Sequence, residues 1–214
     1  MARLGRSLVS LVAVAMLAAC SESPLAPGSD SVDATLARKP KPTSPTPTEP
    51  APSPAPTPTS PTPTGGTTVT GCDGSSVTLT GDESAELQLH NAERARNGLV
   101  AFCVHPALVG AARAHSQDMV ARSYFSHTSA DGRSFVDRVN GAGYTGWTNL
   151  AENIAWGSGS LGEPSTIFTN WMNSTGHRAN ILNPNLREIG IGVASGSFQG
   201  YAGARVYTAN FGTR

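Results

Sequence analysis

A long stretch rich in proline, threonine and serine, residues 40–64, sets the strongest limit on how this chain can fold. Its repeated Pro-Thr pairs supply too few apolar side chains to offset the entropy lost on ordering. Proline favours the extended polyproline II conformation, which predicts a semi-rigid spacer reaching roughly 80 Å, at about 3.1 Å per residue. A packed core must therefore come from the residues that follow. About 140 residues, from Cys72 to Arg214, are enough for one domain.

The N-terminus has the pattern of an export signal. Two arginines lie within the first six residues, and an apolar run over residues 8–19 follows them. That run is too short to cross a bilayer as a permanent helix, and it ends in small residues. The ending Leu-Ala-Ala-Cys resembles the lipobox of bacterial lipoproteins, in which the cysteine is acylated and the signal is cut just before it. We predict a signal peptide over residues 1–19, a palmitate-type lipid at Cys20 and a disordered linker over residues 20–71.

The same pattern predicts where the protein resides. A lipid at Cys20 would hold it on the extracytoplasmic side of a bacterial membrane, and Ser21 favours the outer membrane where there are two. The alternative is an ordinary cleaved signal with a chance cysteine. Export also implies an oxidising compartment, so Cys72 and Cys103 are expected to form a disulfide; two unpaired thiols are the alternative.

The charge distribution argues against a nucleic-acid partner. The formal net charge is zero, and both lysines, Lys39 and Lys41, lie in the linker, which leaves scattered arginines in the domain. Nucleic-acid binding needs a basic stripe that displaces counterions from phosphates. The sequence contains no such stripe.

Helix signals come first in the domain and strand signals later. Capping-box spacing at Thr80 and Glu83 predicts one helix, and Pro106 suits the first turn of a second. Further periodic segments predict two more helices and three strands, namely helices over residues 134–140 and 164–175 and strands over residues 77–80, 189–193 and 203–211. The last two strands are expected to pair antiparallel. With no βαβ rhythm, this order predicts the α+β class.

Five short strings follow one another along residues 84–212. They are His90-Asn91 with Arg94, Tyr124-Phe125-Ser126-His127, Glu152-Asn153-Ile154-Ala155, Trp171 with Gly176-His177-Arg178-Ala179-Asn180-Ile181-Leu182, and Glu188-Ile189-Gly190-Ile191-Gly192. In this order they resemble the CAP superfamily of cysteine-rich secretory proteins, antigen 5 and pathogenesis-related proteins, and most of all its bacterial branch. The resemblance implies an SCP-like α–β–α sandwich with an antiparallel central sheet for residues 72–214.

The resemblance also implies a surface cleft lined by two histidines and acidic residues. His127 and His177 match the cleft histidines, and Glu152 matches the glutamate of the Glu-Asn-Ile string. Eukaryotic members place a second glutamate three residues after the tryptophan of the fourth helix, where this chain has Ser174. We take Glu188 as the candidate for the missing carboxylate.

Several chemistries fit these residues. Two imidazoles and a carboxylate could coordinate zinc or another divalent metal and leave one coordination position for water. The metal-bound water could then act as a nucleophile. A serine nucleophile, Ser126 or Ser174, beside a histidine base is a second option. A third is a buried polar network that only orders loops.

The leading hypothesis is a cell-envelope binding protein whose cleft takes a metal, a lipid or another envelope component. A secreted metallohydrolase acting on peptide or peptidoglycan bonds is the rival, and a structural or adhesive surface module is the third. Trp147 and Trp156 flank the segment that contains Glu152 and could line a groove, although core packing explains them equally well. The sequence leaves catalysis open and favours binding.

Overall fold

The structure, a computed structural model, describes residues 37–38 and 66–214. The predicted signal peptide, Cys20 and most of the predicted linker lie outside the described residues. The described elements are β1 (Ala37–Arg38), β2 (Thr67–Thr70), β3 (Ser76–Leu79), α1 (Gly81–Arg96), β4 (Cys103–Val104), α2 (Pro106–Arg122), α3 (Phe135–Gly141), β5 (Asn149–Gly157), the 3-10 turn η1 (Gly159–Gly162), α4 (Pro164–Asn173), α5 (Thr175–Ile181), β6 (Glu188–Phe198) and β7 (Tyr201–Thr213).

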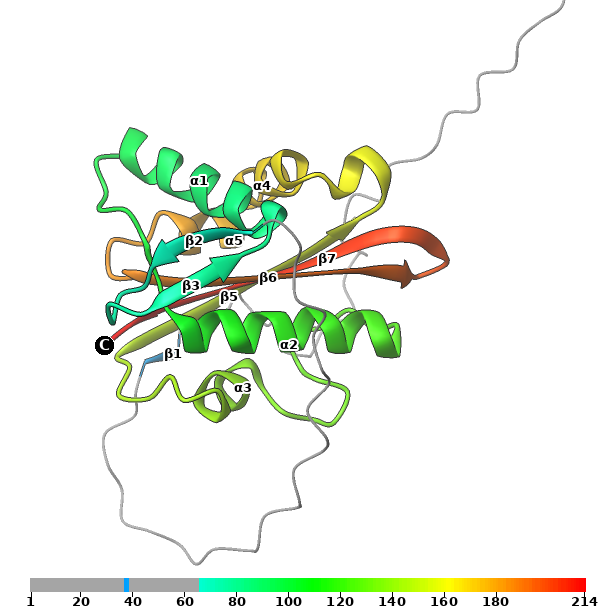
Figure 1. Cartoon of the computed structure of the whole chain (residues 1–214), viewed down its shortest axis with the longest axis horizontal. Helices are drawn as coiled ribbons and strands as arrows, with labels where there is room; N and C mark the ends of the chain where they lie inside the picture. Colours follow the sequence, from blue (N-terminus) through cyan, green and yellow to red (C-terminus); the bar gives the residue numbers. More distant parts are fainter. Residues whose placement is uncertain (1–36, 39–65) are drawn as a thin grey trace, which may run out of the picture. The chain divides into compact units, whose positions relative to one another are not determined.

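A five-stranded sheet forms the middle layer, in the order β1-β5-β7-β6-β4, and β2 and β3 form a separate hairpin. Helices α2 and α3 cover one face of the sheet, and α1, α4 and α5 cover the other (Figure 1). The predicted α+β class and the three-layer sandwich are confirmed. The central strands pair antiparallel, as expected, whereas the short β4 pairs parallel to β6.

The helices begin where their capping residues predict. Thr80 and Glu83 form a capping box at the start of α1, and Ser134 with Asp137 does the same for α3. These side chains satisfy backbone N–H groups that have no partner inside the helix. In the described part of the chain, no helix is long and apolar enough to span a membrane.

The two glycines of β6 bring the sheet unusually close to α2. The alternation of isoleucine and glycine predicts a half-buried strand with one open face, but both faces are covered. A Cβ atom on Gly190 would lie 2.0 Å from the Leu108 backbone, and one on Gly192 would lie 2.1 Å from the Arg113 backbone. The glycines are therefore a contact surface for a helix, and the half-buried prediction is wrong for this strand.

Two elements that carry the site differ from expectation. The segment around Glu152, for which no helix or strand is predicted from the sequence, is the nine-residue strand β5. The fourth helix ends at Asn173, earlier than predicted, and a separate helix, α5, starts at Thr175. Glu152 therefore lies on a strand, and His177 lies within a helix.

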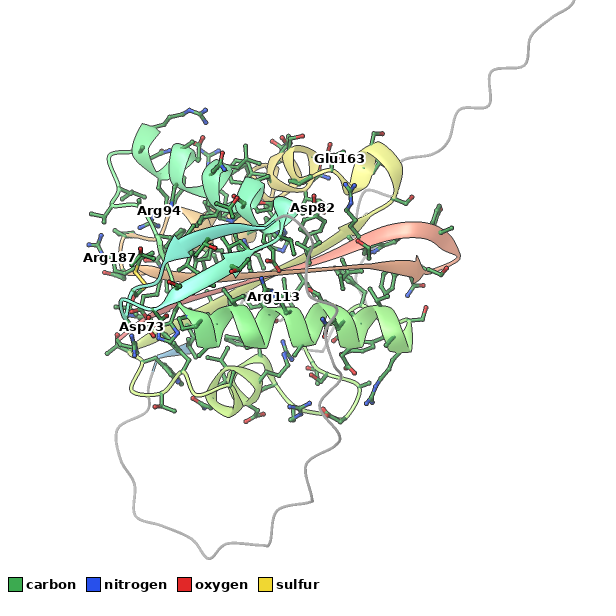
Figure 2. All side chains as sticks on the ribbon, viewed as in Figure 1. Asp73, Asp82, Arg94, Arg113, Glu163 and Arg187 are labelled. Atoms are coloured by element: carbon green, nitrogen blue, oxygen red, sulfur yellow. A yellow bond between two sulfur atoms is a disulfide. The ribbon has the colours of Figure 1, made fainter. Side chains whose placement is uncertain are left out.

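A buried arginine fixes the far end of α5. Arg94 of α1, labelled in Figure 2, is fully buried, and among the described residues it forms no ion pair with a carboxylate. Its guanidinium donates to four backbone carbonyls, at 2.8–3.0 Å, those of Val100, Ile181, Asn183 and Leu186. Hydrogen bonds to a charged donor are stronger than neutral ones. The loop after α5 is thus tied to α1.

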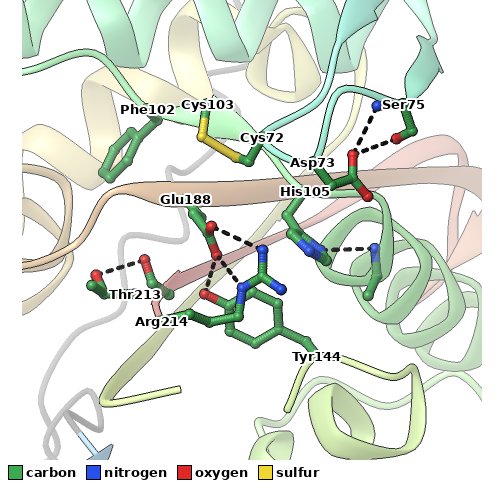
Figure 3. The surroundings of a disulfide bond; sticks show 12 residues. Cys72, Asp73, Ser75, Phe102, Cys103, His105, Tyr144, Glu188, Thr213 and Arg214 are labelled. Atoms are coloured by element: carbon green, nitrogen blue, oxygen red, sulfur yellow. Dashed lines mark hydrogen bonds and ion pairs between the residues drawn. A yellow bond between two sulfur atoms is a disulfide. The ribbon is translucent and has the colours of Figure 1, made fainter. Parts of the chain in front are cut away.

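The predicted disulfide is present. Cys72 and Cys103 are bonded, with Cα atoms 5.4 Å apart, and they join the turn after β2 to β4 (Figure 3). The backbone supports the same junction, because Cys72 N–H donates to the Val104 carbonyl at 2.8 Å. The small hairpin is thereby fastened to the edge of the main sheet.

Candidate functional site

The buried carboxylate of Glu152 is the centre of the site. Its side chain is fully buried on the face of β5 that α2 and α3 cover. His127 Nδ1–H donates to Glu152 Oε1 at 2.8 Å, and Arg138 of α3 donates to Oε2 at 2.6 Å. Burying a charge is costly unless it is paired and hydrogen-bonded, and Glu152 has both kinds of partner.

Arg138 also holds the loop that carries His127. Its guanidinium donates to the His127 carbonyl at 2.7 Å and to Ser129 Oγ at 3.1 Å. Asn210 of β7 is a further partner of the carboxylate. In the amide orientation that satisfies both of its polar atoms, it donates to Glu152 Oε2 at 3.0 Å and accepts from Ala112 N–H at 3.3 Å. Neither Arg138 nor Asn210 was predicted as part of the site. The position of His127 is therefore set by three separate elements.

His177 approaches the same edge of the sheet from the opposite face. It lies on α5, where its carbonyl accepts from Asn153 Nδ2 at 3.1 Å, and Asn180 Nδ2 donates to Asn153 Oδ1 at 2.8 Å. Burial lowers the pKa of the His177 imidazole, and the nearby His127 lowers it further. A lowered pKa favours the neutral ring, which is the form that binds metals.

The hydrogen bond to Glu152 decides which nitrogen of His127 is available. Since the carboxylate accepts from Nδ1–H, the neutral ring has its lone pair on Nε2. The His127 side chain is 31% exposed, so the ring is partly open to solvent. Both oxygens of Glu152 are already engaged, which makes the glutamate a support for the histidine rather than a free ligand.

The donor atoms fit an open metal site better than a closed one. Within residues 37–38 and 66–214, the one group of three metal-ligating side chains with all ligand atoms inside 4.8 Å is Cys72, Cys103 and Glu188. The disulfide removes both of those thiols. His127, His177 and Glu152 do not form such a compact group. A metal ion held here would have the two imidazoles as its protein ligands, and water or a bound molecule would fill its other positions.

Glu188 is not brought to the histidines. Tyr144 Oη–H donates to one of its oxygens, and Arg214 contacts the carboxylate at 3.3 Å (Figure 3). It lies on β6, which β7 separates from β5. The structure thus gives Glu188 a different set of partners beside the disulfide.

The serines do not form a nucleophile–base pair in the described structure. Ser126 Oγ accepts from the backbone N–H of Thr128 at 3.0 Å, which is a local turn contact. Ser174 is the N-cap of α5, without a side-chain cap bond. Among the described residues, neither hydroxyl is hydrogen-bonded to a histidine that could take its proton.

The other histidines and tryptophans have packing or capping roles. His115 is buried and donates to the Ser126 carbonyl at 2.9 Å, while His105 caps α2 by accepting from Ala107 N–H. Trp147 and Trp171 are buried in the core, and Trp156 is partly buried.

The fold and the site together define an α–β–α sandwich with a histidine pair at one sheet edge. A comparison with protein families matches residues 87–211 to the family described as "CAP: Cysteine-rich secretory protein family". The chain belongs to the cysteine-rich secretory protein (CAP) family.

Comparisons with individual proteins support the same family assignment. The uncharacterized protein YkwD of Bacillus subtilis is 42% identical over 116 residues, which cover 54% of this chain and 44% of YkwD. An extracellular SCP-domain protein of Bacillus anthracis matches with a TM-score of 0.55 and 29% identity, over 63% of this chain and 41% of that one. An outer surface protein of Borrelia burgdorferi, at 16% identity, shares the fold with a TM-score of 0.52, over 70% of this chain and 98% of that one. This chain spans less than half the length of the two Bacillus proteins.

Proposed function

We propose that this chain is an exported, lipid-anchored envelope protein whose cleft binds a divalent metal ion between His127 and His177. The observation that carries the proposal is the 2.8 Å contact between His127 Nδ1 and Glu152 Oε1. A histidine that binds metal commonly donates its other N–H to a carboxylate, which orients the ring and raises its basicity.

The surroundings support binding more than hydrolysis. When bound, a zinc ion would supply Lewis acidity for an oxygen atom of the ligand. Glu152 holds the His127 ring, and Arg138 compensates the charge of the carboxylate. Because both glutamate oxygens have partners, Glu152 is poorly placed to take a proton from water. With two protein ligands the site suits reversible binding.

Location is supported by sequence and by similarity. The signal and lipobox pattern ending at Cys20 predicts a lipid anchor, and the similar proteins from Bacillus anthracis and Borrelia burgdorferi are described as extracellular and outer surface proteins. We expect radiolabelled palmitate to be incorporated into the wild-type protein and not into Cys20→Ser. Equal labelling of both proteins would contradict the anchor.

Zinc titration calorimetry on the full chain tests the metal site. We expect His127→Ala with His177→Ala to abolish zinc binding, and Glu152→Gln to weaken it by about 10- to 100-fold. The matched control is His105→Asn, which changes a histidine outside the cleft and keeps a capping side chain. Unchanged zinc affinity in the double variant would rule out this site. Peptide or peptidoglycan turnover lost in Glu152→Gln would instead favour the hydrolase.

A further inference from the structure

The disulfide lies directly beside a carboxylate. The ligand atoms of Cys72, Cys103 and Glu188 all lie within 4.8 Å of one another, and the Glu188 carboxylate faces the sulfur–sulfur bond (Figure 3). In the oxidised protein the two sulfurs are bonded to each other and are not free to bind an ion. Reduction would leave two thiols next to an acid. Two thiolates and a carboxylate are a ligand set that suits zinc.

The backbone brings these three residues together without the disulfide. Cys103 and Glu188 are direct partners in the parallel pairing of β4 with β6. Cys72 N–H donates to the Val104 carbonyl at 2.8 Å, and Cys103 N–H donates to the Arg187 carbonyl at 3.1 Å. None of these contacts uses a sulfur atom. We therefore expect the two thiols to stay beside Glu188 after the sulfur–sulfur bond is broken.

One oxygen of Glu188 is firmly held and the other is not. Tyr144 Oη–H donates to Oε2, and burial raises the pKa of this phenol, so the hydroxyl remains a donor. Among the described residues, the partner of Oε1 is Arg214, at 3.3 Å, and the Arg214 side chain is 40% exposed. An exposed ion pair contributes little, so a metal ion can displace it. Tyr144 would then orient the carboxylate, as residues behind a metal ligand commonly do.

We infer that reduction of the Cys72–Cys103 disulfide creates a zinc site, with the two thiolates and Glu188 Oε1 as ligands and water in the fourth position. A dithiol supplies the two electrons. Its thiolate attacks the sulfur of Cys103, because Cys103 is exposed whereas Cys72 is partly buried. The sulfur–sulfur bond of the protein breaks, a sulfur–sulfur bond forms in the reductant, and the two protons of the dithiol pass to the cysteines. Zinc then displaces both protons to solvent.

The bound ion would join the same segments as the disulfide. Its ligands come from the turn after β2, from β4 and from β6. The small hairpin would thus remain fastened to the main sheet in the reduced protein when zinc is present. This site does not use the cleft histidines, so the inference does not rest on the proposed function.

Cobalt titration of the full chain tests the site. Cobalt(II) occupies zinc sites, its bonds to thiolates absorb in the near ultraviolet, and zinc displaces it because zinc binds more tightly. All proteins carry Cys20→Ser, which leaves Cys72 and Cys103 as the only cysteines. The reductant is a phosphine, which takes an oxygen atom from water and adds no thiol. We expect an absorption band in the reduced protein that zinc removes, and none in the oxidised protein. Equal bands in both proteins, or none in the reduced one, would overturn the inference.

Glu188→Gln distinguishes a site with three protein ligands from two free thiols. We expect this variant to bind cobalt about tenfold more weakly or worse. Glu163→Gln is the matched control, because it also removes a carboxylate paired with an arginine, Arg205, and it should bind cobalt like the wild type. Equal affinities of the two variants would contradict the site. His127→Ala with His177→Ala should keep the cobalt band, so this inference and the metal site of the cleft can fail separately.

Urea denaturation shows whether the ion binds the folded protein. An ion that binds the folded state alone raises the urea midpoint, and binding to the unfolded chain reduces that effect. The proteins compared here also carry His127→Ala and His177→Ala, so that the cleft does not contribute. Zinc should raise the midpoint of this reduced protein and raise it much less when Glu188→Gln is added. A cobalt band without any rise in the midpoint would mean that unfolded thiols bind the ion, and the inference would be wrong.

Discussion

At the scale of single residues, Glu86 is a carboxyl group buried in an environment that disfavours its charged form. Within the described residues, neither of its carboxyl oxygens has a hydrogen-bond partner. Burial, with a smaller contribution from Asp82, raises its pKa to about 9. Burial lowers the pKa of the neighbouring His90 to about 4. The two side chains approach to 3.4 Å, but both are uncharged at neutral pH, so their contact is not an ion pair.

These shifts predict a stability optimum near pH 6.5. The pKa of Glu86 in the folded protein lies above its ordinary value of 4.5. Glu86 therefore lowers the free energy of unfolding progressively as the pH rises from 4.5 to 9. His90 and His115 have folded pKa values of about 4, below the ordinary 6.5, so their contributions appear as the pH rises from 4 to 6.5. Between pH 4.5 and 6.5, the gain in the free energy of unfolding from the two histidines exceeds the loss from Glu86.

Glu86→Gln should remove the alkaline decline. Between pH 6.5 and 9 the wild-type free energy of unfolding should fall by up to roughly 1.4 kcal/mol per pH unit, and that of the variant should stay level. Urea denaturation at a series of pH values measures both. Glu93→Gln, on the same helix but near the surface, serves as the control and should keep the decline. A parallel decline in Glu86→Gln would show that another group titrates.

The resemblance identified the residues that carry chemistry more readily than the residues that hold them. His127, Glu152 and His177 came from short strings of the sequence that match the family pattern. Arg138 and Asn210 gave no such signal, because an arginine on a short helix and an asparagine on a strand are common at the surface. Their role depends on distant segments meeting at Glu152, which local periodicity does not encode.

At the scale of elements, local chemistry predicted helix starts well and strand β5 poorly. Thr80, Glu83 and Ser134 satisfy nearby N–H groups, so the signal is contained within a few residues. β5 lies between helices on both faces, which hides the polar–apolar alternation of an ordinary strand. Gly176 indicated a break, yet it lies inside α5, because a glycine can be tolerated in a helix at a cost of about 1 kcal/mol.

The contact between α2 and β6 provides a matched pair of glycine variants. Gly190→Ala would place a Cβ atom against the backbone of α2, which cannot move as a flexible side chain can, so we expect a loss of about 3 kcal/mol or more. Gly110→Ala, on α2 itself, meets open space and should stabilise the helix by about 0.5–1 kcal/mol. Thermal unfolding of both variants checks the prediction. Equal shifts would mean that the helix and strand can separate at little cost.

At the scale of the whole molecule, the disulfide closes a loop that spans α1. Cys72 and Cys103 are separated by 31 residues, and the chain-entropy account gives such a crosslink about 3–4 kcal/mol. Cys72→Ser with Cys103→Ser should lower the free energy of unfolding by about that amount in urea. Wild type treated with a thiol reductant should lose the same amount. A double variant as stable as the oxidised protein would show that the β2–β3 hairpin is held by its backbone contacts alone.

The order of the strands also determines when the domain can become complete. β7 is the last strand in sequence, yet it lies between β5 and β6 and is the neighbour through which they are joined. A chain that crosses a membrane N-terminus first would deliver β5 and β6 while their shared partner is still inside the channel. Tertiary structure would then form only once Tyr201–Thr213 had emerged, so translocation would be finished before folding could oppose it.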